Sequence, residues 1–286
     1  MTIPIAILLG LVQGIAEFLP VSSSGHLNLL QALFGVNLEN QLLFNILLHV
    51  GTLVAVLIVF WRDWLDMLLH PIKNHTLGLL FIASMPALAG KLIFSDQLDV
   101  LESSTRYLGI FFMVTGIFLI AAQGIVQYRE KHHIFQKDQV GVGSALVMGF
   151  LQAVGMLPGV SRSGSTIFGG VLAGLDRKTA AKFSFMMSAP AIAGSLLSEG
   201  KDALETGFTF SSDILAIVIG MVVAGISGYF AIRFFMKLIS SKTLYGFALY
   251  MIVMGIIVIL LQTAGILQDA PREAQTLQTA ISVFFG

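Results

Sequence analysis

The sequence contains no cysteine, so disulfide bonds and thiolate chemistry are both excluded. Charged residues make up only 11% of its 286 residues, compared with about 25% in an ordinary soluble domain. The formal net charge is zero, which gives no electrostatic basis for a nucleic-acid partner. Hydrophobic residues account for 56% of the chain, and the mean hydropathy is +0.88. This composition indicates a protein that crosses a membrane several times.

Six apolar stretches are candidates for membrane-spanning helices, most of them close to the roughly 20 residues that a crossing needs. They cover residues 41–61, 76–94, 106–126, 183–197, 213–235 and 243–267. Hydrocarbon offers no partners to backbone N–H and C=O groups, so helices are the expected structure for these stretches. We therefore expect an all-α integral membrane protein that forms a single membrane domain over residues 1–286.

Two polar clusters interrupt the apolar chain, EFLPVSSSGH at 17–26 and PGVSRSGST at 158–166. A shift of 139 positions aligns the clusters without a gap, together with glycine and glutamine residues ahead of them. A repeat of this size, with a polar break in each copy, is typical of a site built between two related halves. The halves are expected at 1–139 and 140–286.

Lysine and arginine collect in alternate loops, which the positive-inside tendency places in the cytoplasm. The loops can alternate in this way only if residues 1–40 and 141–178, which hold the polar clusters, enter the membrane and return to the same side. We therefore predict two inverted halves, each a re-entrant hairpin followed by three transmembrane helices, with six crossings in total. Irregular backbone at membrane depth must be buried in protein or line a wet cavity, so the two hairpin tips are expected to meet.

The first cluster places a carboxylate inside an apolar helical run. Gln13 and Glu17 are four residues apart, so their side chains share one helix face. A carboxylate in a membrane segment costs at least about 2.5 kcal/mol. Glu17 should therefore have a partner such as a metal ion, Arg162 or His26, unless it is solvated at an interface.

Hydroxyls and an imidazole follow directly. Ser22 and Ser23 are candidate nucleophiles, and His26 is a side chain that titrates near neutral pH. Ser24 is expected to cap a helix. His49, in the middle of the 41–61 stretch, is expected to have a supporting or packing role.

Arg162 is the most informative residue of the second cluster. A guanidinium at membrane depth is expensive, and its planar fork suits the oxygens of a phosphate. Ser161, Ser163 and Thr166, with the backbone amides of a helix expected to begin near Thr166, would complete an anion-binding site around it. The alternative is that Arg162 forms a structural ion pair with Glu17.

The segment from Gln13 to Glu17 followed by PVSSSGH, and the later PGVSRSGST, resemble the motifs of the undecaprenyl-diphosphate phosphatase family of bacteria. Length, hydropathy and the internal repeat agree with that family over essentially the whole chain. The resemblance implies a multi-pass enzyme of the bacterial plasma (inner) membrane that removes the terminal phosphate of undecaprenyl diphosphate, with Mg²⁺ or Ca²⁺ as cofactor. It also implies a role in peptidoglycan assembly and resistance to bacitracin.

The resemblance also suggests a role for each motif residue. Glu17 and Gln13 would bind the divalent cation, although many relatives carry glutamate where this chain has Gln13, and an amide adds no charge. Ser23 is the expected nucleophile, with His26 as its proton-transfer partner. Ser22, or His26 itself, remains an alternative nucleophile. The diphosphate would be held by Arg162, Ser161, Ser163 and Thr166.

A secondary transporter or a flippase for an anionic lipid is the alternative from another class, because inverted repeats with broken helices are also transporter architecture. The charge pattern and the resemblance favour an active site that opens to the periplasmic or outer face. Membrane lipid is an expected partner, and a homodimer is a further expectation.

Overall fold

The computed structural model describes residues 2–34, 41–71, 74–102, 104–205, 214–241 and 243–267, and the following description concerns these residues. They form eleven α-helices, which confirms the expected all-α class. In chain order the helices are α1 (Ile3–Phe18), α2 (Ser23–Phe34), α3 (Gln41–Val59), α4 (Trp61–Leu69), α5 (Thr76–Glu102), α6 (Leu108–Lys131), α7 (Val142–Val154), α8 (Arg162–Leu172), α9 (Arg177–Glu205), α10 (Ile214–Ile239) and α11 (Tyr245–Thr263).

Five helices in the described part of the chain are long and apolar enough to cross a membrane. A sixth crossing results if α3 and α4, which are bent by 74° at a short break, are one span. α5 bends at Phe94, where the backbone leaves helical geometry, and this is also where the predicted stretch 76–94 ends. The multi-pass character predicted from hydropathy is therefore confirmed.

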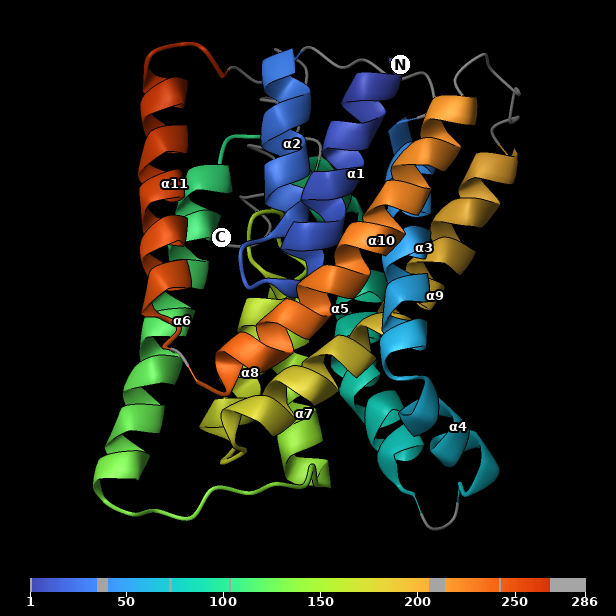
Figure 1. The fold of residues 1–286 in the computed structure, drawn as a ribbon. Coiled ribbons are helices and arrows are strands. Elements are labelled where there is room, and N and C mark those ends of the chain that lie inside the picture. The colour runs from blue at the N-terminus through green and yellow to red at the C-terminus, as the bar shows by residue number, and fades with distance from the viewer. Residues whose placement is uncertain are drawn as a thin grey trace.

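Two helical hairpins are too short to cross. One consists of α1 and α2, and the other of α7 and α8, at corresponding places in the order of elements. Figure 1 shows α1 and α2 in the upper part of the molecule and α7 and α8 in the lower part, with the connecting turns facing each other between them. The hydroxyl of Ser163 donates a hydrogen bond across this junction to the carbonyl of Leu19, over 3.1 Å. The prediction that the two polar clusters meet is confirmed, whereas the division into two inverted halves stays a prediction.

Glycines allow each hairpin to approach a helix of the other half closely. A Cβ atom on Gly10 of α1 would lie 2.5 Å from the carbonyl oxygen of Gly220 in α10. A Cβ atom on Gly149 of α7 would lie 2.5 Å from the carbonyl oxygen of Ala83 in α5. Gly10 and Gly149 are equivalent in the predicted repeat, so the two hairpins use the same kind of packing.

Aromatic packing supports the hairpin tip next to Glu17. Phe18 is fully buried and meets Phe185 of α9 edge to face, with ring centroids 5.5 Å apart. Phe185 in turn lies 5.7 Å from Phe235 of α10. The polar site is therefore held against a rigid apolar cluster. Large apolar side chains such as Phe230 and Leu249 are exposed on α10 and α11, as expected of helices that face lipid.

Candidate active site between the hairpin tips

The Glu17 carboxylate is the point at which the two hairpins meet. Glu17 lies near the end of α1 and is only 8% exposed. Its Oε1 forms an ion pair with Nη2 of Arg162 at 2.5 Å. Its Oε2 accepts hydrogen bonds from Ser23 Oγ at 2.6 Å and from Gln13 Nε2 at 3.1 Å. Ser23 and Arg162 occupy equivalent positions of the predicted repeat, and each binds a different oxygen of one carboxylate.

Arg162 is held on two sides. Besides the ion pair, its Nη1 donates to the backbone carbonyl of Ser184 in α9 at 3.2 Å. Its side chain is 16% exposed. The pairing of Glu17 with Arg162 answers the question of the carboxylate's partner, and it matches the ion-pair alternative considered for Arg162.

The helix that carries Arg162 begins at Arg162 itself, and the predicted start near Thr166 is wrong. The reason is a capping interaction, because the side chain of Ser161 accepts a hydrogen bond from the backbone N–H of Gly164 at 3.1 Å. Three hydroxyls expected around the anion are buried and bonded within the protein. Ser163 bonds to Ser161 and to the Leu19 carbonyl, and Thr166 bonds to the Arg162 carbonyl and to the Ser184 hydroxyl.

The predicted contact between Ser23 and His26 does not form. The His26 Nδ1 lies 2.8 Å from the backbone carbonyl of Ser22, and its Nε2 lies 2.6 Å from the hydroxyl of Tyr250 in α11. A carbonyl can only accept, so Nδ1 carries the proton and Nε2 accepts from Tyr250. Glu17, not His26, is the group within hydrogen-bond distance of Ser23.

Ser22 has an unusual backbone. Its φ is +66°, in the left-handed region, which costs a residue other than glycine about 1–3 kcal/mol. The Ser22 hydroxyl accepts from the backbone N–H of Gly25 at 3.3 Å, so Ser22 caps α2, and the expected capping role of Ser24 is wrong. Three consecutive serines made the start of this helix ambiguous in the sequence.

The supporting role expected for His49 of α3 agrees with its position, because its Nε2 lies 3.8 Å from Glu17 Oε2. Sequence reasoning missed Tyr250 altogether, although it bonds to His26. Its position 224 residues away along the chain carried no local signal.

Oxygen atoms suited to a hard cation are present beside Glu17. The Oε1 of Gln13 is buried, and among the described residues it has no hydrogen-bond partner. Mg²⁺ is commonly held by one or two protein carboxylates together with substrate phosphates. The described residues contain no cluster of three or more His, Cys, Asp or Glu side chains suited to a metal, so much of the coordination would fall to the substrate. With that sharing, Gln13 and Glu17 fit a divalent cation.

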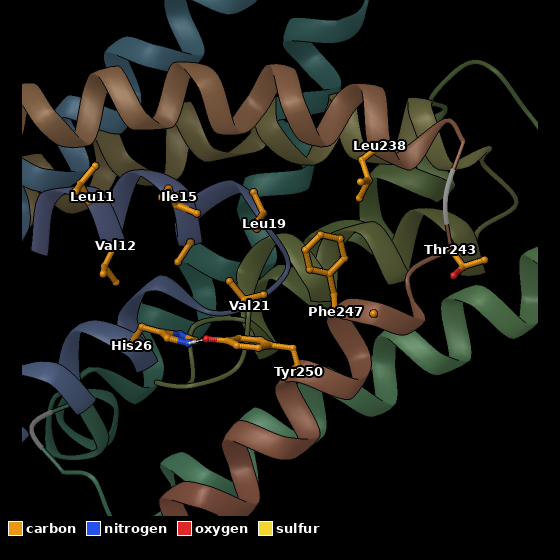
Figure 2. A pocket seen from close by; sticks show the side chains of 12 residues that line it. Leu11, Val12, Ile15, Leu19, Val21, His26, Leu238, Thr243, Phe247 and Tyr250 are labelled. Carbon is orange, nitrogen blue, oxygen red and sulfur yellow. Dashed lines mark hydrogen bonds between the residues drawn. The ribbon is translucent and has the colours of Figure 1, made fainter. Parts of the chain in front are cut away.

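An apolar cavity of about 600 Å³ adjoins this region. Figure 2 shows its walls, which come mainly from α1 and from the α10–α11 end of the chain, with side chains such as Leu11, Ile15 and Phe247. His26 and Tyr250 lie together at its edge, joined by their hydrogen bond. His26 thus lines the cavity and lies three residues after Ser23 in the same helix, α2.

These features define a polytopic α-helical membrane protein in which a buried carboxylate, hydroxyl and guanidinium adjoin an apolar cavity. Residues 6–257 match the family model described as "Bacitracin resistance protein BacA", and the chain belongs to this family. The family resemblance inferred from the motifs is confirmed.

Curated relatives cover nearly the whole chain. A protein of Halothermothrix orenii named "Undecaprenyl-diphosphatase" is 39% identical over 261 residues, which are 91% of this chain and 97% of the relative. A protein of the same name from Carboxydothermus hydrogenoformans is 40% identical over 262 residues, with 91% and 97% covered. A third from Rhodopirellula baltica is 38% identical over 255 residues, with 89% and 96% covered.

Proposed function

We propose that this protein hydrolyses undecaprenyl diphosphate to undecaprenyl phosphate and inorganic phosphate, which recycles the lipid carrier for peptidoglycan synthesis and confers resistance to bacitracin. The observation that carries this proposal is the meeting of Ser23, Glu17 and Arg162 at the hairpin tips. The names of the relatives support the same substrate. A transporter or flippase is not favoured, because a hydroxyl bonded to a buried carboxylate is the arrangement that activates a nucleophile.

Ser23 is the proposed nucleophile and Glu17 its base. The Ser23 hydroxyl already donates to Glu17 Oε2. As Ser23 Oγ attacks the terminal phosphorus, its proton passes to Glu17, the anhydride P–O bond breaks, and undecaprenyl phosphate leaves. Water then attacks the phosphoserine, the bond from phosphorus to Ser23 Oγ breaks, and the proton on Glu17 returns to that oxygen. The first half leaves Glu17 protonated, and the second half returns it to the carboxylate for the next turnover, while both protons of the attacking water leave with the inorganic phosphate.

Arg162 is the proposed holder of the terminal phosphate. Its guanidinium neutralises Glu17 in the structure. When a phosphate replaces Glu17 as the ion-pair partner of the guanidinium, the carboxylate becomes free to accept the Ser23 proton. Substrate binding and activation of the base are therefore linked. Phosphoryl transfer relies mainly on positioning and charge neutralisation, which an arginine supplies. The hydroxyls of Ser161, Ser163 and Thr166 shape the first turn of α8 and so orient Arg162 toward the site.

A divalent cation, Mg²⁺ or Ca²⁺, belongs to this proposal. Gln13 Oε1 and Glu17 would hold it, and when bound it would neutralise charge on the phosphate oxygens.

Ser22 is a weaker candidate for the nucleophile, because its hydroxyl is used in capping α2. His26 is better suited to a supporting role than to that of nucleophile, since both of its ring nitrogens are bonded.

We further propose that the protein resides in the bacterial plasma (inner) membrane with its active site open to the periplasmic or outer face. The distribution of lysine and arginine among the loops supports this orientation. We also propose that the protein forms a homodimer in the membrane.

The test of this function is phosphate release from undecaprenyl diphosphate by the purified protein in detergent with Mg²⁺. Ser23→Ala is expected to lower the rate at least about 1,000-fold, as the loss of a nucleophile does. The matched control is Ser24→Ala, one residue further along α2, which should retain nearly full activity. A wild-type protein that releases no phosphate but moves the lipid between liposome leaflets would overturn the phosphatase in favour of a flippase. Near-normal activity in Ser23→Ala would remove Ser23 as the nucleophile.

A further inference from the structure

The imidazole of His26 is held more firmly than packing alone requires. Both ring nitrogens are bonded, one to the carbonyl of Ser22 and the other to the hydroxyl of Tyr250. The Tyr250 ring stacks on it at 8° with centroids 5.7 Å apart, and the Phe112 ring lies on it at a centroid distance of 5.1 Å. The ring is therefore fixed at both nitrogens and packed against two aromatic rings.

The backbone at Ser22 takes part in this arrangement. Its left-handed conformation accompanies the placement of the carbonyl that receives Nδ1–H. A strained residue persists only where its surroundings over-determine it, and such residues cluster at functional sites. The strain, the two hydrogen bonds and the two ring contacts all act on one side chain, which indicates that the orientation of His26 is itself important.

We propose that Tyr250 is a positioning residue for the phosphatase reaction, and that it acts through His26. Its hydroxyl anchors Nε2 of His26 at the wall of the apolar cavity (Figure 2). His26 follows Ser23 by three residues in α2, so the orientation of its ring is linked to the helical turn that carries the proposed nucleophile. This inference rests on the proposed function, because it assigns a residue to that reaction. Nothing in the two sequence motifs indicates it, since Tyr250 lies in the last described helix.

The hydroxyl and the ring of Tyr250 make separable contributions. The hydroxyl is the hydrogen-bonding anchor, whereas the ring stacks on His26 and lines the cavity. Tyr250→Phe removes only the anchor and leaves the stack. A small misplacement of a group at an active site lowers the rate by up to about 100-fold. The expected effect of losing one of two anchors is a kcat about tenfold lower, with KM nearly unchanged.

The matched control is Tyr245→Phe in the same helix. The Tyr245 hydroxyl also donates a hydrogen bond, to Gln127 Oε1 at 3.0 Å, but Tyr245 is not among the residues that line the cavity. Tyr245→Phe should therefore keep the wild-type kcat and KM. Thermal unfolding in detergent, measured for every variant, excludes a loss of fold as the cause of a lower rate.

The decisive experiment is a double-mutant cycle on phosphate release from undecaprenyl diphosphate, with wild type, Tyr250→Phe, His26→Ala and the double variant. If Tyr250 acts through His26, the double variant has the same kcat as His26→Ala. A further drop of about tenfold in the double variant would overturn the proposal, because Tyr250 would then act independently of His26. A Tyr250→Phe protein with wild-type kcat would overturn it as well. Wild type that releases no phosphate would instead refute the proposed function.

A spectroscopic readout is independent of activity. In protein with ¹⁵N-labelled histidine, Tyr250→Phe should shift the Nε2 resonance of His26 and leave its Nδ1 protonated, whereas Tyr245→Phe should shift neither. Unchanged His26 resonances in Tyr250→Phe would show that the hydroxyl does not anchor the ring, and so would also overturn the proposal.

Discussion

In the proposed mechanism, single residues at the hairpin tips have two roles, because the contacts that stabilise the fold also prepare the chemistry. Glu17 binds Arg162 through one oxygen and Ser23 through the other. Removing one partner of a buried ion pair leaves an uncompensated charge, which usually costs more than removing both. Stability and activity can therefore be separated by experiment.

The first residue-scale prediction concerns this ion pair. Glu17→Gln should lower stability by about 3 kcal/mol, because the partly buried Arg162 loses its counter-charge. Glu17→Gln combined with Arg162→Met should recover most of that stability, since both charges are gone. Both proteins should release almost no phosphate, as thermal unfolding and phosphate assays on the purified proteins would determine. Substantial phosphate release by the double variant would mean that the pair is purely structural.

The second residue-scale prediction concerns the cation. Gln13→Glu places a second carboxylate next to Glu17, and additional ligand charge raises the affinity for a divalent cation. After metal is removed with EDTA and Mg²⁺ is titrated back, the Mg²⁺ concentration for half-maximal activity should be about tenfold lower in Gln13→Glu than in wild type. Gln152→Glu is the control, because Gln152 is the equivalent of Gln13 in the predicted repeat and has Met156 in the place of Glu17. An unchanged Mg²⁺ requirement in Gln13→Glu would argue against Gln13 as a ligand.

Much of this site was accessible from the sequence. The cost of charge in an apolar segment singled out Glu17 and Arg162, and the family resemblance favoured Ser23. The contact of His26 with Tyr250 was not accessible, because it depends on how α2 and α11 are rotated toward each other. The local pattern of one helix does not encode the rotation of a distant one.

Individual helices depend on close backbone contact at glycines. α1 carries Gln13 and Glu17 and packs on α10 at Gly10 and Gly220, while Gly109 and Gly255 approach each other between α6 and α11. Small residues permit such approach where no hydrophobic force drives helices together in lipid. The position of the Glu17 carboxylate is therefore set partly by a glycine two turns away.

At this scale we predict that Gly10→Ala destabilises the protein by about 1–3 kcal/mol, because the new methyl group would lie 2.5 Å from a backbone oxygen of α10. Activity should fall as well, since α1 shifts with Glu17. Gly143→Ala in α7 is the control, because a Cβ there meets nothing within 4 Å and alanine is the better helix former by up to about 1 kcal/mol. Equal unfolding temperatures of the two variants in detergent would contradict the packing argument.

Helix boundaries were predicted unevenly. Hydropathy placed the end of the 76–94 stretch at the bend of α5 and the end of the 41–61 stretch close to the break between α3 and α4. It did not place the start of α8, which is set by the Ser161 cap. Hydropathy reports where apolar surface lies, whereas a helix starts where its first N–H groups find partners.

At the scale of the molecule, two hairpins in the described part of the chain approach each other from opposite sides, and their tips form one site (Figure 1). The loop charges place the first hairpin on the outer side and the second on the inner side. We propose that the site between them opens to the outer face.

The absence of cysteine from the natural sequence allows a direct test of that orientation. Ser24→Cys at the first hairpin tip should react with a membrane-impermeant thiol reagent in intact cells. Lys131→Cys, at the end of α6 on the expected cytoplasmic side, should react only after permeabilisation. Labelling of Lys131→Cys but not of Ser24→Cys in intact cells would reverse the assigned orientation.

Hydropathy, motif order and the internal repeat were sufficient to establish a multi-pass all-α protein, its family and the meeting of two polar clusters. They suffice because a bilayer forces backbone hydrogen bonds into helices and makes every buried charge conspicuous. Tertiary packing alone decided that Ser23 lies on Glu17, that Arg162 neutralises the same carboxylate, and that His26 turns toward Tyr250. These contacts depend on helix caps, on the left-handed backbone of Ser22 and on the rotation of helices that are distant in the sequence. All three are determined only when the hairpins pack together.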